Sequence, residues 1–130
     1  GTIPHDRLPD FYREMDILVL PSRTTRNWQE QFGRVLVEAM ACGTVVVGSS
    51  CGAIPEVIGG AGVVFPEGDA HMLADRLNEL AQSPEKRASL AERGIERVRR
   101  MYTHEQQASV LRNSLLRILE NSDHTQRSRN

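Results

Sequence analysis

Two glutamates, Glu30 and Glu38, lie on either side of Gly33 in a segment that suits the binding of a phosphorylated ligand. A helix that begins at Gly33 leaves the backbone N–H groups of residues 32–36 without intrahelical acceptors. These groups and the helix dipole favour an anion, and a phosphate group is the obvious candidate. Glycine at this point lets a ligand approach the backbone closely. The segment therefore predicts an anion site at the start of a helix.

Glu38 lies about 7 Å further along this helix, at about 1.5 Å per residue. A side chain there tilts back toward the helix start. Its carboxylate can accept two hydrogen bonds from a vicinal diol, such as the ribose of a nucleotide whose diphosphate sits at the helix start. The other interpretation is an ordinary exposed helix residue.

Glu30 precedes the helix, so helical geometry does not fix its direction. We expect its side chain to point across the mouth of the pocket, toward whatever extends beyond the phosphates. An acidic residue that only stabilises the positive end of the helix dipole is the alternative.

Three apolar runs indicate the elements that position these residues. Ile17–Leu20, Val45–Val47 and Val63–Phe65 have the composition of strands buried on both faces. A helical pattern from Val35 to Met40 connects the first two runs and closes at Gly43. Strand, helix and strand form a βαβ unit, which implies a parallel sheet. The glutamates then lie at the carboxyl edge of that sheet, where open α/β sheets bind ligands.

A second glycine-bearing turn follows the second strand. It contains Gly52, which we expect to line the same crevice, and Pro55, which suits the first turn of a short helix. A plain tight turn between strand and helix is the alternative.

The second half of the chain is expected to be helical. Asp69 is a candidate N-cap for a helix that includes Leu80, and a second helix begins at Ser83 or Pro84 and ends near Met101. A capping-box pattern at 103–106 opens a third helix with an apolar stripe. So small a sheet cannot cover all of this apolar surface, so we expect further sequence upstream.

Bulk composition narrows the class of protein. The 130 residues are 39% hydrophobic and 25% charged with a net charge of −1, which is typical of a soluble domain and does not indicate a nucleic-acid partner. No apolar run is long enough to span a bilayer, and the first residues do not resemble a signal peptide. Two cysteines favour a reducing, cytoplasmic location. The four histidines form no metal-ligand motif.

Arg93, Arg97 and Arg100 recur at helical spacing. A solvated helix face balanced by Glu92 and Glu96 is the favoured interpretation. Contact with acidic lipid at the inner face of a membrane is the alternative.

The ordered motifs resemble those of the retaining family 4 glycosyltransferases of GT-B fold. The shared string is Pro-Ser, a glutamate, seven residues, a second glutamate, Ala-Met-Ala, a small residue and glycine, then a valine-rich strand. In this sequence it consists of Pro21–Ser22, Glu30, Glu38, Ala39–Gly43 and Val45–Val47. The turn with Gly52 and Pro55–Val57 and the strand Gly62–Pro66 match the motifs that follow. The resemblance covers about residues 1–100.

The resemblance implies a role for each matching residue. Glu38 would bind the ribose of the donor, and Glu30 would be the catalytic residue beside the reacting carbon of the transferred sugar. Glu30 would orient the sugar and stabilise positive charge without forming a covalent adduct. The residues that bind substrate would be Phe32, Gly33, Arg34, Val35, Glu38 and Gly52. For Arg34, the alternative to a contact with the phosphates is an ordinary exposed arginine on the helix.

It also implies a fold and an activity. The fold would be α/β, a Rossmann-like parallel sheet with flanking helices, in residues 1–120 of a partial C-terminal donor-binding domain. Residues 103–120 would be its final helix, packing toward an absent N-terminal acceptor domain, and residues 121–130 a disordered tail. The enzyme would transfer a sugar from a nucleotide-diphosphate sugar to a sugar or lipid-linked acceptor, as in polysaccharide biosynthesis. We expect no cofactor or metal, and no activity from this piece alone.

The sequence departs from the family pattern at two positions, Thr44 for the usual proline and Ala53 for glycine or glutamate. The Arg/Lys pair that holds the diphosphate in the family would lie upstream. Two other functions stay open: a non-catalytic module that binds nucleotide sugars, and a GT-B-like sugar-nucleotide epimerase. A glycoside hydrolase fits less well, because Glu38 lies inside a helix and cannot flank a glycosidic bond with Glu30.

Overall fold

The computed structural model of the protein describes residues 3–103, 105 and 106. The chain divides between Val98 and Arg99 into two units, and the sheet and the site lie in the first. The elements, in order, are η1 (His5–Arg7), α1 (Leu8–Arg13), β1 (Ile17–Leu20), α2 (Arg34–Ala41), β2 (Val45–Ser49), α3 (Ile54–Ile58), β3 (Val63–Phe65), α4 (Ala70–Gln82) and α5 (Pro84–Met101).

The three strands form a parallel sheet in the order β1-β2-β3, which confirms the predicted arrangement. Val19 pairs with Val47, and Val47 pairs with Val63. Strand β2 is buried from end to end, whereas β1 is half-buried along its whole length. The expectation that the first strand is fully buried on both faces is therefore wrong, because β1 is only half-buried. Within the described residues, β1 has a hydrogen-bonded neighbour on one side only.

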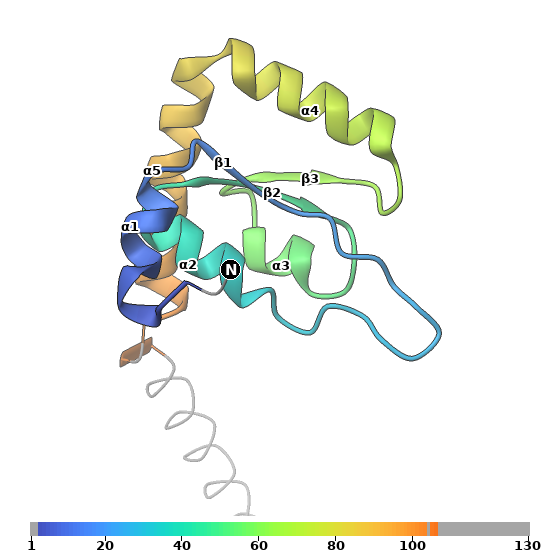
Figure 1. The fold of residues 1–130 in the computed structure, drawn as a ribbon, viewed down its shortest axis with the longest axis horizontal. Helices are drawn as coiled ribbons and strands as arrows, with labels where there is room; N and C mark the ends of the chain where they lie inside the picture. Colours follow the sequence, from blue (N-terminus) through green and yellow to red (C-terminus); the bar gives the residue numbers. More distant parts are fainter. Residues whose placement is uncertain (1–2, 104, 107–130) are drawn as a thin grey trace, which may run out of the picture. The chain divides into compact units, whose positions relative to one another are not determined.

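Helices cover both faces of the sheet (Figure 1): α4 lies on one face, and α2 and α3 lie on the other. One face carries a buried cluster made of Val45, Val47, Phe65, Leu80 and Leu90. On the other face, Gly48 leaves room for α3. A Cβ atom at Gly48 would lie 2.4 Å from Ile54 and 2.8 Å from Ile58. The alternation of side chains along β2 therefore builds both layers of the fold.

The helix boundaries follow the capping residues that the sequence indicates. The Asp69 carboxylate accepts a hydrogen bond from the Met72 N–H at 2.8 Å, at the start of α4. The Ser83 hydroxyl accepts one from the Lys86 N–H at 3.3 Å, at the start of α5. Each bond satisfies a donor that the first helical turn leaves without an acceptor.

The capping-box pattern at 103–106 is present in part. The Thr103 hydroxyl accepts a hydrogen bond from the Gln106 N–H at 3.3 Å. The rest of the helix predicted to residue 120 and the tail predicted for 121–130 lie outside the described residues. Those domain boundaries stay predictions. No helix in the described part of the chain is long and apolar enough to cross a bilayer.

Candidate functional site

The segments that follow β1 and β2 meet at one edge of the sheet. The Ala53 N–H donates to the Glu30 carbonyl at 3.0 Å. The Ser49 hydroxyl donates to the Ser22 carbonyl at 2.6 Å. These two bonds fix the long loop between β1 and α2 along the turn after β2. The two motifs that the sequence places at the carboxyl edge are therefore adjacent in space.

Gly52 lies directly against the backbone of Glu30. Its φ is 53°, and a Cβ atom would lie 2.0 Å from the Glu30 carbonyl oxygen. Only glycine fits this position, because both the backbone conformation and the space exclude a side chain. Gly52 thus lies directly beside Glu30 at the carboxyl edge of the sheet. Its place in a crevice and its contact with a substrate stay predictions.

Glu67 is part of this edge, and sequence analysis did not single it out. Its carboxylate accepts hydrogen bonds from the Thr24 N–H at 2.5 Å and the Thr24 hydroxyl at 2.9 Å. The Glu67 N–H donates to the Ser50 hydroxyl at 2.9 Å. Glu67 therefore ties the loop after β1 to the turn after β2. One signal was available, because Glu67 directly follows the third apolar run and Pro66, at the same carboxyl edge.

Helix α2 begins where the sequence predicts. Gly33 is its N-cap residue, with a left-handed φ of 70° and ψ of 52°. A Cβ atom here would crowd Leu36 at 3.1 Å and Leu20 at 3.3 Å. Glycine has no side chain, so it cannot cap the helix as serine or aspartate does.

The Glu30 carboxylate instead bonds to the backbone just before the helix. Its Oε1 atom accepts hydrogen bonds from the Gly33 N–H at 2.9 Å and the Phe32 N–H at 3.4 Å, and the Ser22 hydroxyl donates to Oε2 at 3.5 Å. A carboxylate is favoured there by the partial positive charge of the helix end. Two expectations were therefore wrong: Glu30 does not point across the pocket mouth, and the N–H groups of Phe32 and Gly33 are not free.

Other donors remain at the helix start. The Leu36 N–H bonds to the Gly33 carbonyl at 2.9 Å. The N–H groups of Arg34 and Val35 lie in the first turn of α2, where a helix offers no intrahelical acceptor. The side chains around them face solvent: Phe32 is 40% exposed and Val35 is 38% exposed. Arg34 is exposed as well. An anion that reaches this turn would meet two amide donors and the helix dipole.

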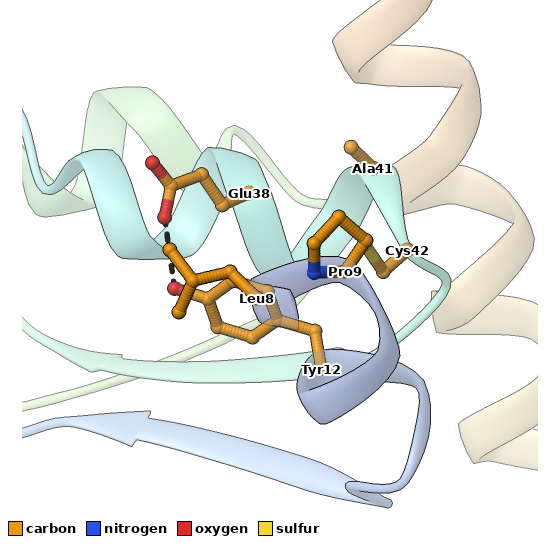
Figure 2. Close-up of a pocket in the computed structure, with 6 residues that line it drawn as sticks. All are labelled: Leu8, Pro9, Tyr12, Glu38, Ala41 and Cys42. Carbon is orange, nitrogen blue, oxygen red and sulfur yellow. Dashed lines mark hydrogen bonds between the residues drawn. The ribbon is translucent and has the colours of Figure 1, made fainter. Parts of the chain in front are cut away.

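The Glu38 side chain bonds to α1, as Figure 2 shows. The Tyr12 hydroxyl donates to Glu38 Oε2 at 2.8 Å. Both residues line a hollow of about 190 Å³ between α1 and α2, and Glu38 is half-buried there. Burial, together with the hydrogen bond to Glu38 and its charge, raises the pKa of Tyr12 to about 12. The interpretation of Glu38 as a plain exposed helix residue is therefore wrong.

The arginine-rich stretch of α5 is partly used within the fold. The Arg97 guanidinium donates to the Val57 carbonyl at 2.7 Å and to the Glu56 carbonyl at 2.6 Å. It thereby satisfies carbonyl groups at the end of α3. Arg97 is half-buried. The interpretation of this stretch as a fully solvated helix face therefore does not hold for Arg97. The lipid-contact alternative loses one of its three arginines.

Among the described residues, no group of three or more histidine, cysteine, aspartate and glutamate side chains is arranged to hold a metal ion. Cys42 and Cys51 are free thiols. The expectation that donor binding uses no cofactor stays a prediction.

A three-stranded parallel sheet with flanking helices, and with two glycine-bearing turns at its carboxyl edge, is a Rossmann-like α/β fold. The chain belongs to the glycosyltransferase family described as glycosyl transferases group 1, which matches residues 1–97. This finding confirms the predicted family. Among curated proteins, the chain is 36% identical over 81 residues to D-inositol 3-phosphate glycosyltransferase of Streptomyces bingchenggensis. That match covers 61% of this chain and 17% of the relative.

Solved structures of the same class share the fold. Sucrose-phosphate synthase from Thermosynechococcus elongatus has a TM-score of 0.73 at 31% identity, over 94% of this chain and 30% of that one. Anabaena HepE, solved in complex with UDP, has a TM-score of 0.66 at 28% identity, over 81% of this chain and 29% of that one. The fold is therefore similar to the C-terminal domains of GT-B glycosyltransferases. The chain spans less than a third of each of these relatives.

Proposed function

We propose that this chain is the donor-binding part of a retaining hexosyltransferase. The enzyme transfers a sugar from a nucleotide-diphosphate sugar to a sugar or lipid-linked acceptor. One observation carries the proposal: the start of α2 lies between two carboxylates, Glu30 at the sheet edge and Glu38 in a hollow further along the helix. The UDP bound to HepE supports a nucleotide as the ligand.

The parts of the donor follow the helix axis in this proposal. The diphosphate lies at the first turn of α2, where the N–H groups of Arg34 and Val35 point at it. The ribose diol donates to the Glu38 carboxylate. The sugar lies beyond the phosphates, near Glu30 and the Gly52 turn. The exposed side chains of Phe32 and Arg34 flank the diphosphate. Gly33 shapes the helix start but offers no donor, because its N–H is bonded to Glu30.

Glu30 acts through its charge. The bonds from the Gly33 and Phe32 N–H groups hold its carboxylate beside the start of α2. The bond between the sugar and the phosphate breaks, and the acceptor hydroxyl forms the new bond on the same face of the sugar. The departing phosphate takes the acceptor's proton. The Glu30 carboxylate stabilises the positive charge that develops on the sugar meanwhile, and it forms no covalent bond.

The decisive variant is Glu38→Ala in the full-length protein. We expect it to weaken the binding of a nucleoside diphosphate by about 1.5–3 kcal/mol, the usual contribution of hydrogen bonds to a charged group. Calorimetric titration with UDP, GDP and ADP measures this loss and identifies the base. Unchanged affinity for all three would refute the ribose role.

Activity assays of the full-length protein with nucleotide sugars distinguish the competing functions. Transfer of the sugar to an acceptor supports the proposal. Conversion of a nucleotide sugar to its epimer would identify an epimerase. Tight binding with neither reaction would identify a non-catalytic binding module.

A further inference from the structure

We propose that Tyr12 is a positioning residue, which fixes the Glu38 carboxylate for the ribose diol and so favours ligands that carry this diol. This inference rests on the proposed function, because it takes Glu38 to be the ribose ligand. Tyr12 itself touches neither the ribose nor the sugar in this arrangement.

The hydrogen bond between the two side chains leaves the carboxylate able to bind a diol. Tyr12 donates to Oε2 at 2.8 Å, and Figure 2 shows the other oxygen of Glu38 turned away from the phenol. An ionised carboxylate offers about four lone-pair sites, and the phenol occupies one of them. In the described part of the chain, no other hydrogen bond is made to the Glu38 side chain. Tyr12 is therefore the contact that selects one direction for a side chain with several rotatable bonds.

Tyr12 is itself held rigidly. Its side chain is 6% exposed, and its carbonyl accepts a hydrogen bond from the Thr44 hydroxyl at 2.6 Å. Thr44 is 2% exposed, so this hydrogen bond lies in the interior. This bond fixes the backbone of α1 to the segment before β2. It therefore also fixes the backbone position from which the Tyr12 side chain extends.

The environment keeps the phenol in its donor form. The pKa of Tyr12 is raised to about 12, so the hydroxyl is protonated throughout the physiological range. Leu8, Pro9 and Ala41 line the same hollow and offer no side-chain donor, and the free thiol of Cys42, which also lines it, is only a weak donor. Loss of the phenolic oxygen would therefore leave Glu38 without a fixed direction.

The test is a comparison of ligands with and without the diol. The full-length protein is titrated with the tightest binder among UDP, GDP and ADP, and then with its 2′,3′-dideoxy form. Three variants are compared with the wild type: Tyr12→Phe, the reference Glu38→Ala and the matched control Tyr102→Phe, which removes the other phenolic hydroxyl of the chain. Thermal unfolding of each variant reports on the fold separately.

We expect Tyr12→Phe to weaken the binding of the ribonucleotide about 5- to 10-fold, the range given by one lost hydrogen bond. Binding of the dideoxy form should change less than about twofold, because Glu38 has no diol to bind in that ligand. Tyr102→Phe should leave both affinities unchanged. A lower preference for the diol at an unchanged melting temperature supports a positioning role, since a merely structural role would not move this ratio.

Two results would overturn the inference. Equal weakening for both ligands would show that Tyr12 supports the fold and not the carboxylate. Unchanged affinity in Tyr12→Phe, beside a clear loss in Glu38→Ala, would show that Glu38 needs no positioning, and the proposed function would stand. If Glu38→Ala is also without effect, the ribose role itself has failed.

Discussion

At the scale of single residues, Glu30 has a role in the fold and a proposed role in catalysis. Its carboxylate bonds to the N–H groups of Phe32 and Gly33 just before α2, and these bonds hold its charge at the carboxyl edge of the sheet. Removal of the whole side chain would affect both roles at once, because the lost hydrogen bonds cost about 1 kcal/mol of stability by themselves. A variant that keeps an acceptor oxygen separates them.

Glu30→Gln is that variant. Its amide oxygen can still accept from the Gly33 N–H, so we expect stability to change by less than about 1 kcal/mol. Turnover should fall about 10²–10³-fold, the usual effect of removing one group that stabilises charge in the transition state. Affinity for the nucleoside diphosphate should be nearly unchanged. Initial rates and titrations of the full-length enzyme measure these quantities.

Glu56→Gln is a suitable control, because it replaces the same carboxylate by the same amide. Glu56 is exposed in the first turn of α3. Equal loss of turnover in both variants would show that Glu30 has no special role.

The residue-level predictions succeeded where the cause is local. Gly33 at the start of a helix can be predicted from its neighbours, because the helix signal begins directly after it. The direction of the Glu30 side chain could not be predicted. It could point across the pocket or toward the start of α2, and only the geometry of the turn decides between these two positions. The contact between Tyr12 and Glu38 left no signal in the sequence. The two residues are 26 positions apart, and their approach depends on how α1 packs on α2.

At the scale of elements, the turn after β2 positions the loop that carries Glu30. The two meet through backbone atoms at Gly52 and Ala53, with no side chain between them. Because backbone contacts do not adapt by changing rotamer, a displacement of the turn must move the loop.

Gly52→Ala tests this coupling. The new Cβ atom would meet the Glu30 carbonyl oxygen in a backbone conformation with φ of 53°. We expect a loss of stability of more than about 1 kcal/mol and a loss of turnover, because Glu30 must move.

Gly60→Ala is the matched control for this prediction. Its φ is 80°, but its Cβ atom would meet only the Arg93 guanidinium, at 3.7 Å. The control therefore carries the backbone strain without the clash. It should lose stability and keep its turnover, as thermal unfolding and rate measurements can show. Full activity in Gly52→Ala would mean that the turn does not position Glu30.

The strands and most helix ends were predictable because their signals are local as well. Apolar runs identify β1, β2 and β3, and Asp69 and Ser83 mark the starts of α4 and α5. The half-burial of β1 was not predictable, because burial depends on what pairs with a strand and not on its composition.

At the scale of the whole molecule, the described sheet depends on helices that come late in the chain. Leu80 of α4 is fully buried and packs with Phe65 and Val47 of the sheet. The segments around Glu30 and Gly52 come earlier in the sequence than α4, yet they begin on strands that this cluster covers. Stability and binding should therefore respond differently to a change in the core.

Leu80→Ala is expected to destabilise the fold by about 2–5 kcal/mol, through lost burial and the cavity that remains. Val64→Ala, at a position 37% exposed on β3, should cost about 0.5 kcal/mol or less. Thermal unfolding of the full-length protein compares the two. At a temperature where both variants are folded, affinity for the nucleoside diphosphate should be unchanged. A small effect of Leu80→Ala would show that the α4 layer adds little to stability.

The carboxylate that already sits at the start of α2 has a consequence for selectivity among ligands. Sulfate that approaches this helix end meets a like charge and brings no proton donor to offset the repulsion. A phosphate ester of a sugar brings hydroxyl groups with it, and these can satisfy Glu30 while the amides hold the ester. The protein would thereby discriminate against a bare anion such as sulfate and respond to molecules in which phosphate and carbohydrate are joined.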